Sequence, residues 1–138
     1  MAFQPRRELM EINYGEFQGR LKHDHPLHLR LHHVFEPMPG GESLDDVYLR
    51  VCLIAPELLA RLRLGQTLAV VGHYRSNQLL RGAVAGESFE VALARCNYKP
   101  ANGSFLCLQF AGDAGSGHLE EVAFPNDDAR SVPTCEMR

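Results

Sequence analysis

Residues 67–73 read TLAVVGH, a continuous apolar run that ends in a glycine and a histidine. Because the run shows no polar alternation, it predicts a strand that is covered on both faces, as in a parallel sheet. A turn and a helix are predicted to follow, with Ser76 as the residue that caps the helix. We therefore expect His73 at the carboxyl end of a strand, where ligands bind in open α/β sheets.

A long helix is predicted on the amino-terminal side of this strand. Its apolar residues recur at spacings of three and four, which places them on one helical face: Val47, Val51, Ile54, Leu58 and Leu62. Ser43 is the expected N-cap, and the helix is expected to end at Gly65. Pro56 lies inside the pattern and predicts either a kink or two abutting helices.

Two further strands are predicted beyond the second helix. Residues 104–110 follow an Asn-Gly pair, and residues 119–124 follow a glycine-rich turn, so we expect the two segments to form a hairpin. The order helix, strand, helix, strand, strand is typical of an α/β protein. Residues 125–138 contain two prolines and no apolar period, which predicts a flexible tail.

The composition indicates a globular chain of one domain or less. The 138 residues are 45% apolar and 22% charged, and 14 Lys and Arg face 17 Asp and Glu. The chain thus has no basic excess for nucleic acid, and no apolar run approaches the roughly 20 residues of a membrane helix. The four cysteines form no C-x-x-C pair and the N-terminus is no secretory signal, so we expect reduced thiols and a cytoplasmic location.

Three short motifs carry candidate functional residues. The first is LMEINYGEFQGR at residues 9–20, in which Glu11 or Glu16 could act as a proton donor. The second is PGGES at residues 39–43. The third is VVGHYRSN at residues 70–77, which places basic side chains beside a helix N-terminus that suits phosphate. Taken singly, the first motif is more typical of a solvated loop, and the second of a turn and helix cap. The third is explained equally well by a phosphate site and by a histidine that is merely hydrogen-bonded in a loop.

Together the three motifs resemble the histidine phosphatase superfamily, the phosphoglycerate mutase-like group that includes the fructose-2,6-bisphosphatase domains. The matching residues are Leu9, Glu11, Gly15, Gly19, Gly41, Glu42, Ser43, Asp46, Arg50, Val71 and His73. The resemblance extends from about Leu9 to about Phe110. It implies a three-layer αβα sandwich and phosphoryl transfer on small phosphomonoesters through a phosphohistidine.

Six residues are candidates for the site: Glu11, His73, Tyr14, Lys22, Arg75 and Ser76. By the resemblance, Glu11 corresponds to the proton donor and His73 to the second histidine, which binds phosphate. Tyr14 and Lys22 match positions that contact substrate in the mutase branch. The remaining two lie at the start of the predicted helix and are candidates for phosphate contacts. A small phosphorylated metabolite is the expected partner, and no metal or cofactor is expected.

The chain departs from the family at the position of the nucleophile. The family uses the histidine of an Arg-His-Gly tripeptide on its first strand, and none of the seven histidines here lies between Arg and Gly. Only eight residues precede Leu9, so we expect an incomplete sandwich without its first strand, a partial domain over residues 1–124, and little or no turnover. The sheet edge beside Val70 would be unpaired, which favours a homo-oligomer. Tyr74 replaces the small residue or glutamine usual in the family, which would alter the pocket.

Two alternatives remain open at this point. One is a non-catalytic module that binds a phosphate ligand or a protein on the same scaffold. The other is a metal binder, because histidines crowd one short segment: His23, His25, His28, His32 and His33. A polar lid with incidental histidines is the more ordinary interpretation of that segment.

Overall fold

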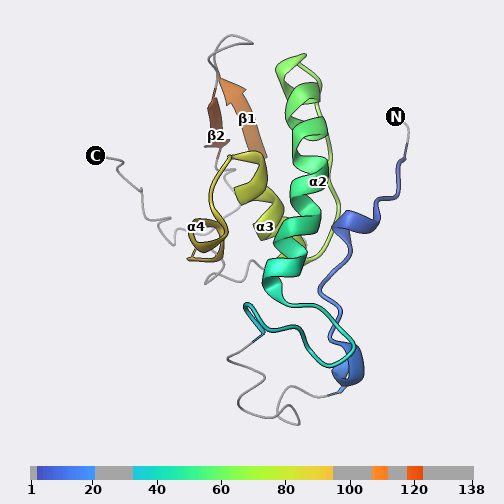
Figure 1. The fold of residues 1–138 in the computed structure, drawn as a ribbon. Helices are drawn as coiled ribbons and strands as arrows, with labels where there is room; N and C mark the ends of the chain where they lie inside the picture. The colour runs from blue at the N-terminus through green and yellow to red at the C-terminus, as the bar shows by residue number, and fades with distance from the viewer. Residues whose placement is uncertain (1–2, 21–32, 95–106, 112–117, 123–138) are drawn as a thin grey trace, which may run out of the picture.

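The computed structural model describes residues 3–20, 33–94, 107–111 and 118–122. These residues form α2 (Leu44–Arg63), α3 (Tyr74–Val84), α4 (Phe89–Ala94), β1 (Cys107–Ala111) and β2 (His118–Val122). Two 3₁₀ turns, η1 (Arg7–Leu9) and η2 (Gly15–Phe17), interrupt the amino-terminal segment. Figure 1 shows α2 as the longest element, with α3 beside it and α4 next to α3.

Helix α2 begins at the predicted cap. The Ser43 hydroxyl accepts a hydrogen bond from the Asp46 amide at 3.0 Å, and the Asp46 carboxylate accepts one from the Ser43 amide at 2.8 Å. The two bonds form a capping box, and the bond from the Ser43 backbone lowers the pKa of Asp46. Pro56 lies on an exposed side of α2, which continues through it to Arg63 as one helix.

The hydrophobic core lies between the three helices. It consists of Ile12, Leu44, Val47, Val51, Ile54, Ala55, Leu79, Leu80, Val84, Phe89 and Ala92. The α2 residues in this cluster include the first three of the predicted apolar face, while Leu58 and Leu62 pack against its edge. The periodicity of α2 therefore identifies correctly the face that is buried.

The expected αβα sandwich is wrong for the part of the chain that the structure describes. Residues 67–73 form neither helix nor strand, and Val70 and Val71 are 38% and 89% exposed. A run of apolar residues becomes a buried strand only where neighbouring strands pair with its backbone. Among the described elements, β1 pairs with β2 alone, so helices form the core in place of a parallel sheet.

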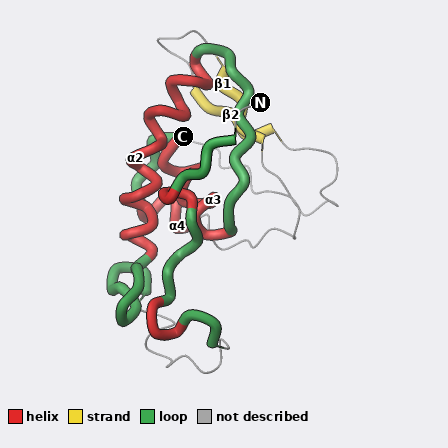
Figure 2. The backbone as a smooth tube through the Cα atoms, turned by 90° about the vertical axis from the view of Figure 1, so that its right-hand side faces the viewer, coloured by secondary structure: helices red, strands yellow, loops and turns green. Residues whose placement is uncertain are grey.

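Strands β1 and β2 are antiparallel, with Cys107 opposite Val122 and Ala111 opposite His118. They overlap the two segments for which the sequence predicts a hairpin. Both views place the hairpin beside the carboxyl-terminal end of α2 (Figures 1 and 2). The predicted tail, residues 125–138, lies outside the described residues. No helix among those described is long and apolar enough to cross a membrane.

Helix α3 starts earlier than the sequence predicts. Its N-cap is His73, whose backbone is extended, and Ser76, the expected cap, lies fully buried in the first turn. The Ser76 hydroxyl contacts the carbonyl oxygens of Leu9 at 3.2 Å and His73 at 3.3 Å. Ser76 thus ties the amino-terminal segment to α3 instead of capping the helix.

Tyr48 on α2 is the group through which we expect alkaline pH to destabilise the fold. Its hydroxyl donates to the backbone carbonyl of Glu87, and its ring packs against Phe89 with 5.5 Å between the centroids. Burial, together with the neighbouring Cys52, raises the pKa of Tyr48 to about 12. An unfolded tyrosine ionises near pH 10, so the folded chain holds this proton more tightly. The resulting stability is complete below pH 10 and is lost as the pH rises through about 12.

We therefore expect Tyr48→Phe to reduce the loss of stability between pH 9 and pH 12. The measurement is the midpoint of urea denaturation of wild type and variant across this range. The wild-type midpoint should fall more steeply than that of the variant, which has no hydroxyl to ionise. Parallel curves for the two proteins would contradict the assignment of this pH dependence to Tyr48.

Candidate active site

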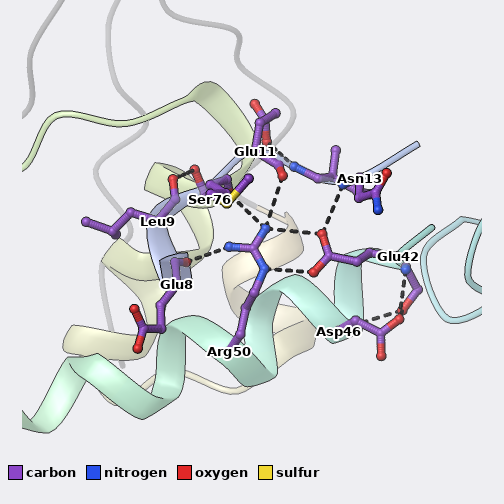
Figure 3. A network of polar contacts seen from close by, with 11 residues as sticks. Glu8, Leu9, Glu11, Asn13, Glu42, Asp46, Arg50 and Ser76 are labelled. Carbon is purple, nitrogen blue, oxygen red and sulfur yellow. Dashed lines mark hydrogen bonds and ion pairs between the residues drawn. The ribbon is translucent and has the colours of Figure 1, made fainter. Parts of the chain in front are cut away.

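The three sequence motifs meet where the amino-terminal segment crosses the loop before α2 and the start of α3 (Figure 3). The backbone amide of Glu42 donates to the backbone carbonyl of Asn13 at 2.8 Å. The backbone amide of Asn13 in turn donates to the Glu42 carboxylate at 2.9 Å. Glu16 adds a backbone bond to the Pro39 carbonyl at 2.9 Å. The crossing is so close that a Cβ on Gly41 would lie 2.7 Å from the Gly15 nitrogen.

Arg50 on α2 bonds both the loop before α2 and the amino-terminal segment at this crossing (Figure 3). Its Nε donates to Oε1 of Glu42 at 2.9 Å in an ion pair. Its Nη1 donates to the carbonyl oxygen of Glu8. Its Nη2 donates to the carbonyl oxygens of Met10 at 2.7 Å and Glu11 at 3.3 Å. A single guanidinium therefore gathers the backbone of residues 8–11 against α2.

Glu11 reaches from this segment to the first turn of α3. Its Oε2 accepts a hydrogen bond from the Arg75 amide at 3.2 Å, and its Oε1 accepts one from the Ile12 amide at 3.0 Å. The first amides of a helix have no intrahelical partner and lie at its positive end, so a carboxylate is stabilising there. Glu11 is thus fixed close to His73, the N-cap of the same helix.

The other candidate side chains surround this point. His73 is exposed and lines an open hollow of about 230 Å³ together with Phe3, Met10 and Val71. The Arg75 guanidinium lies over the Tyr74 ring, 4.8 Å from its centroid.

Tyr14 is half-buried and lies within electrostatic reach of two of these groups. Burial raises the pKa of Tyr14, the charge of Glu11 raises it further, and the charge of Arg75 lowers it. The phenol therefore responds to both charges at the start of α3.

Five of the six predicted site residues are brought together at the start of α3: Glu11, His73, Tyr14, Arg75 and Ser76. Lys22 lies outside the described residues, as do four of the clustered histidines, His23, His25, His28 and His32. Over the described ranges no group of three or more side chains could hold a metal ion. The functional role of each predicted residue stays a prediction.

The contacts of Glu42 and Arg50 are not evident from the sequence, although both residues match the family motif. Their spacing carries a signal. Glu42 directly precedes the Ser43 cap, and Arg50 follows it by seven residues, about two helical turns. Both side chains then face the segment that crosses the start of α2. Nothing in the spacing says that their partners are backbone carbonyls.

The comparison with protein-family models finds one that covers most of the chain. The model for the histidine phosphatase superfamily (branch 1) matches residues 1–120. No curated protein and no solved structure is found to match. The matched range contains all three motifs and the crossing at which they meet. The chain belongs to the histidine phosphatase superfamily.

Proposed function

We propose that this chain binds the phosphoryl group of a small phosphomonoester at the N-terminus of α3. Membership of a superfamily that binds small phosphorylated substrates supports this ligand class. The observation that carries the proposal is the bond between the Glu11 carboxylate and the Arg75 amide. In this bond an anionic oxygen occupies a helix N-terminus that also carries His73 and Arg75, and such a terminus favours an anion.

Each side chain has a distinct part in this proposal. His73 and Arg75 supply donors and positive charge to the phosphoryl oxygens, which is how cationic groups stabilise phosphoryl transfer. Glu11 would release the Arg75 amide to a phosphoryl oxygen when the ester binds; its position corresponds to the residue that, once protonated, gives a proton to the leaving oxygen in the family's reaction. Tyr14, which responds to the charges of both Glu11 and Arg75, would contact the rest of the substrate.

We further propose that these 138 residues bind the ester with little or no turnover. The covalent route requires a histidine nitrogen to attack phosphorus while the leaving alcohol takes a proton. No histidine of the chain lies between Arg and Gly, the tripeptide that carries the nucleophile in the family. Binding without hydrolysis is the behaviour of a non-catalytic module that keeps the phosphate half of the site.

Binding is tested by adding inorganic phosphate and then p-nitrophenyl phosphate to the ¹⁵N-labelled chain. We expect amide shifts concentrated at residues 74–76. His73→Ala and Arg75→Ala should each weaken binding about tenfold, the loss expected for one charge-assisted hydrogen bond. Arg61→Ala is the matched control, because this α2 arginine bonds Gln66 on the exposed surface. A folded sample without shifts at the start of α3 would remove the proposed site.

Turnover is followed separately by release of p-nitrophenol from the same ester. We expect a rate that does not exceed the rate in buffer alone. Robust hydrolysis that disappears in His73→Ala would show that the chain catalyses the reaction without the family nucleophile. The claim of binding without turnover would then be abandoned.

A further inference from the structure

We propose that Arg50 is a positioning residue for this site, acting through Glu11. Its importance for ligand binding rests on the proposed function, whereas the placement that it enforces is testable without a ligand. The Arg50 guanidinium lies on the α2 side of the amino-terminal segment, and the Glu11 carboxylate points to α3 on the other side (Figure 3). Arg50 thus acts on Glu11 through the backbone.

The Arg50 guanidinium is held in place by its partners. Glu42 receives two of its donors, Nε at 2.9 Å and Nη2 at 3.3 Å, which makes a two-pronged ion pair. The two side chains are only 18% and 27% exposed, so water screens the pair less than it would at the surface. The backbone amide of Asn13 also donates to Oε2 of this carboxylate, at 2.9 Å, and helps to fix it.

The fixed guanidinium shapes the backbone of residues 8–11. The turn η1 ends at Leu9, and Met10 has an extended conformation with φ −62° and ψ 152°. The chain therefore changes direction immediately before Glu11. Arg50 bonds the carbonyl oxygens of Glu8, Met10 and Glu11, on both sides of this change. These bonds fix the backbone at Glu11 and so set the direction in which its side chain points.

Lysine cannot replace arginine at position 50 in this arrangement. A guanidinium is a planar fork with five N–H donors, and it can serve a carboxylate and several carbonyls at fixed angles. An ammonium group keeps the charge but offers no planar fork. Arg50→Lys should therefore approximately preserve the ion pair with Glu42, but it should lose the simultaneous hydrogen bonds to the carbonyl oxygens of residues 8–11.

The experiment follows hydrogen exchange at the Arg75 amide in the full chain without ligand. This amide donates to Glu11, whereas the Asn77 amide in the same turn donates to the His73 carbonyl at 2.9 Å and serves as an internal reference. We expect Arg50→Lys to lower protection at Arg75 about tenfold relative to Asn77. Glu11→Ala should lower the same ratio directly.

Glu57→Gln is the matched control for this measurement. Glu57 pairs with Arg6 and also links the amino-terminal segment to α2, but this pair is 35% and 44% exposed and does not involve residues 8–11. The Arg75 to Asn77 ratio should remain at its wild-type value in this variant. A fall as large as that in Arg50→Lys would mean that any tether to α2 suffices, and it would overturn the specific role of Arg50.

An unchanged ratio in folded Arg50→Lys would overturn the proposal, as would equal losses at both amides, which would indicate general loosening of α3. If Arg50→Lys does not fold, Glu42→Gln serves as the second variant. It weakens the ion pair that holds the guanidinium and should lower the ratio of protection at Arg75 to that at Asn77. If neither variant folds, Arg50 is required for folding itself, and the proposal is also overturned.

The outcome is distinguishable from failure of the proposed function. If phosphate does not shift the start of α3 but Arg50→Lys lowers the ratio, the positioning role stands and the phosphate site is lost. If Glu11→Ala leaves the ratio at its wild-type value, the bond between Glu11 and Arg75 does not order this amide. The positioning role would then be withdrawn together with the observation that carries the phosphate site.

Discussion

Replacing Gly41 by alanine is expected to destabilise the fold by about 3 kcal/mol, at the upper end of the cost of overpacking. The new Cβ would collide with the carbonyl oxygen of Asn13 and lie 2.7 Å from the nitrogen of Gly15. Both are backbone atoms, so neither can rotate away as the end of a side chain would. The two segments must separate, and the backbone bond between Glu42 and Asn13 is lost with them. Urea denaturation of the variant and the wild type measures the difference.

The neighbouring glycine provides the control. Gly40 has φ +67°, a conformation that L residues adopt at a cost, but nothing lies within 4 Å of a Cβ placed there. Gly40→Ala should therefore cost only about 1–2 kcal/mol, the penalty of the left-handed conformation. If Gly41→Ala proves no more damaging than Gly40→Ala, the close crossing of the two motifs is not present in solution.

Leu79→Ala is expected to cost about 3 kcal/mol, within the range for truncating a buried leucine. Leu79 is fully buried on α3, in the cluster shared with α2 and α4. Its loss removes apolar contacts and leaves a cavity in a core of few residues. Because natural domains have about 5–15 kcal/mol of stability in total, the change should lower the denaturation midpoint strongly.

Leu53→Ala is the matched control, since the same side chain is removed from α2 at a position that is 76% exposed. We expect a change within about 0.5 kcal/mol, as for most surface substitutions. A cost similar to that of Leu79→Ala would contradict the assignment of the two helix faces. The comparison therefore tests which side of the helical assembly is its interior.

The helix around Val47 and Val51 could be predicted because its signals are local. The Ser43 cap, the acidic first turn and the spacing of apolar residues all lie within the helix or next to it. Each signal can be interpreted without knowing what the helix packs against. The burial of Val47 and Val51 confirms this interpretation.

The predicted parallel strand failed because strand formation is not local. Val70 and Val71 have the apolar character of a buried strand, but a strand also needs backbone partners from elsewhere in the chain. Among the described residues no segment supplies them, and Val71 stays almost fully exposed. A sequence pattern of this kind specifies an affinity for burial, not the presence of a neighbour.

The motifs predict which residues form the candidate site, but they do not predict the contacts that hold those residues together. The family pattern predicts Glu11 and His73 by position, and in the structure the Glu11 carboxylate bonds the first turn of α3, whose N-cap is His73. The contacts of Arg50 and Ser76 could not be predicted, because they involve backbone carbonyls of residues 8–11. A carbonyl carries no residue identity, so no sequence pattern marks it as a partner.

The span of the contacts around Arg50 has a consequence for the order in which the molecule forms. Arg50 is 42 residues from Glu8, and the Arg75 amide is 64 residues from Glu11. Closing such long loops costs conformational entropy, which is offset only once the contacts have formed. During synthesis, residues 8–11 leave the ribosome well before either partner exists. The amino-terminal segment therefore cannot dock until α2 and the start of α3 have emerged, so the candidate site forms only after residue 75 has left the ribosome.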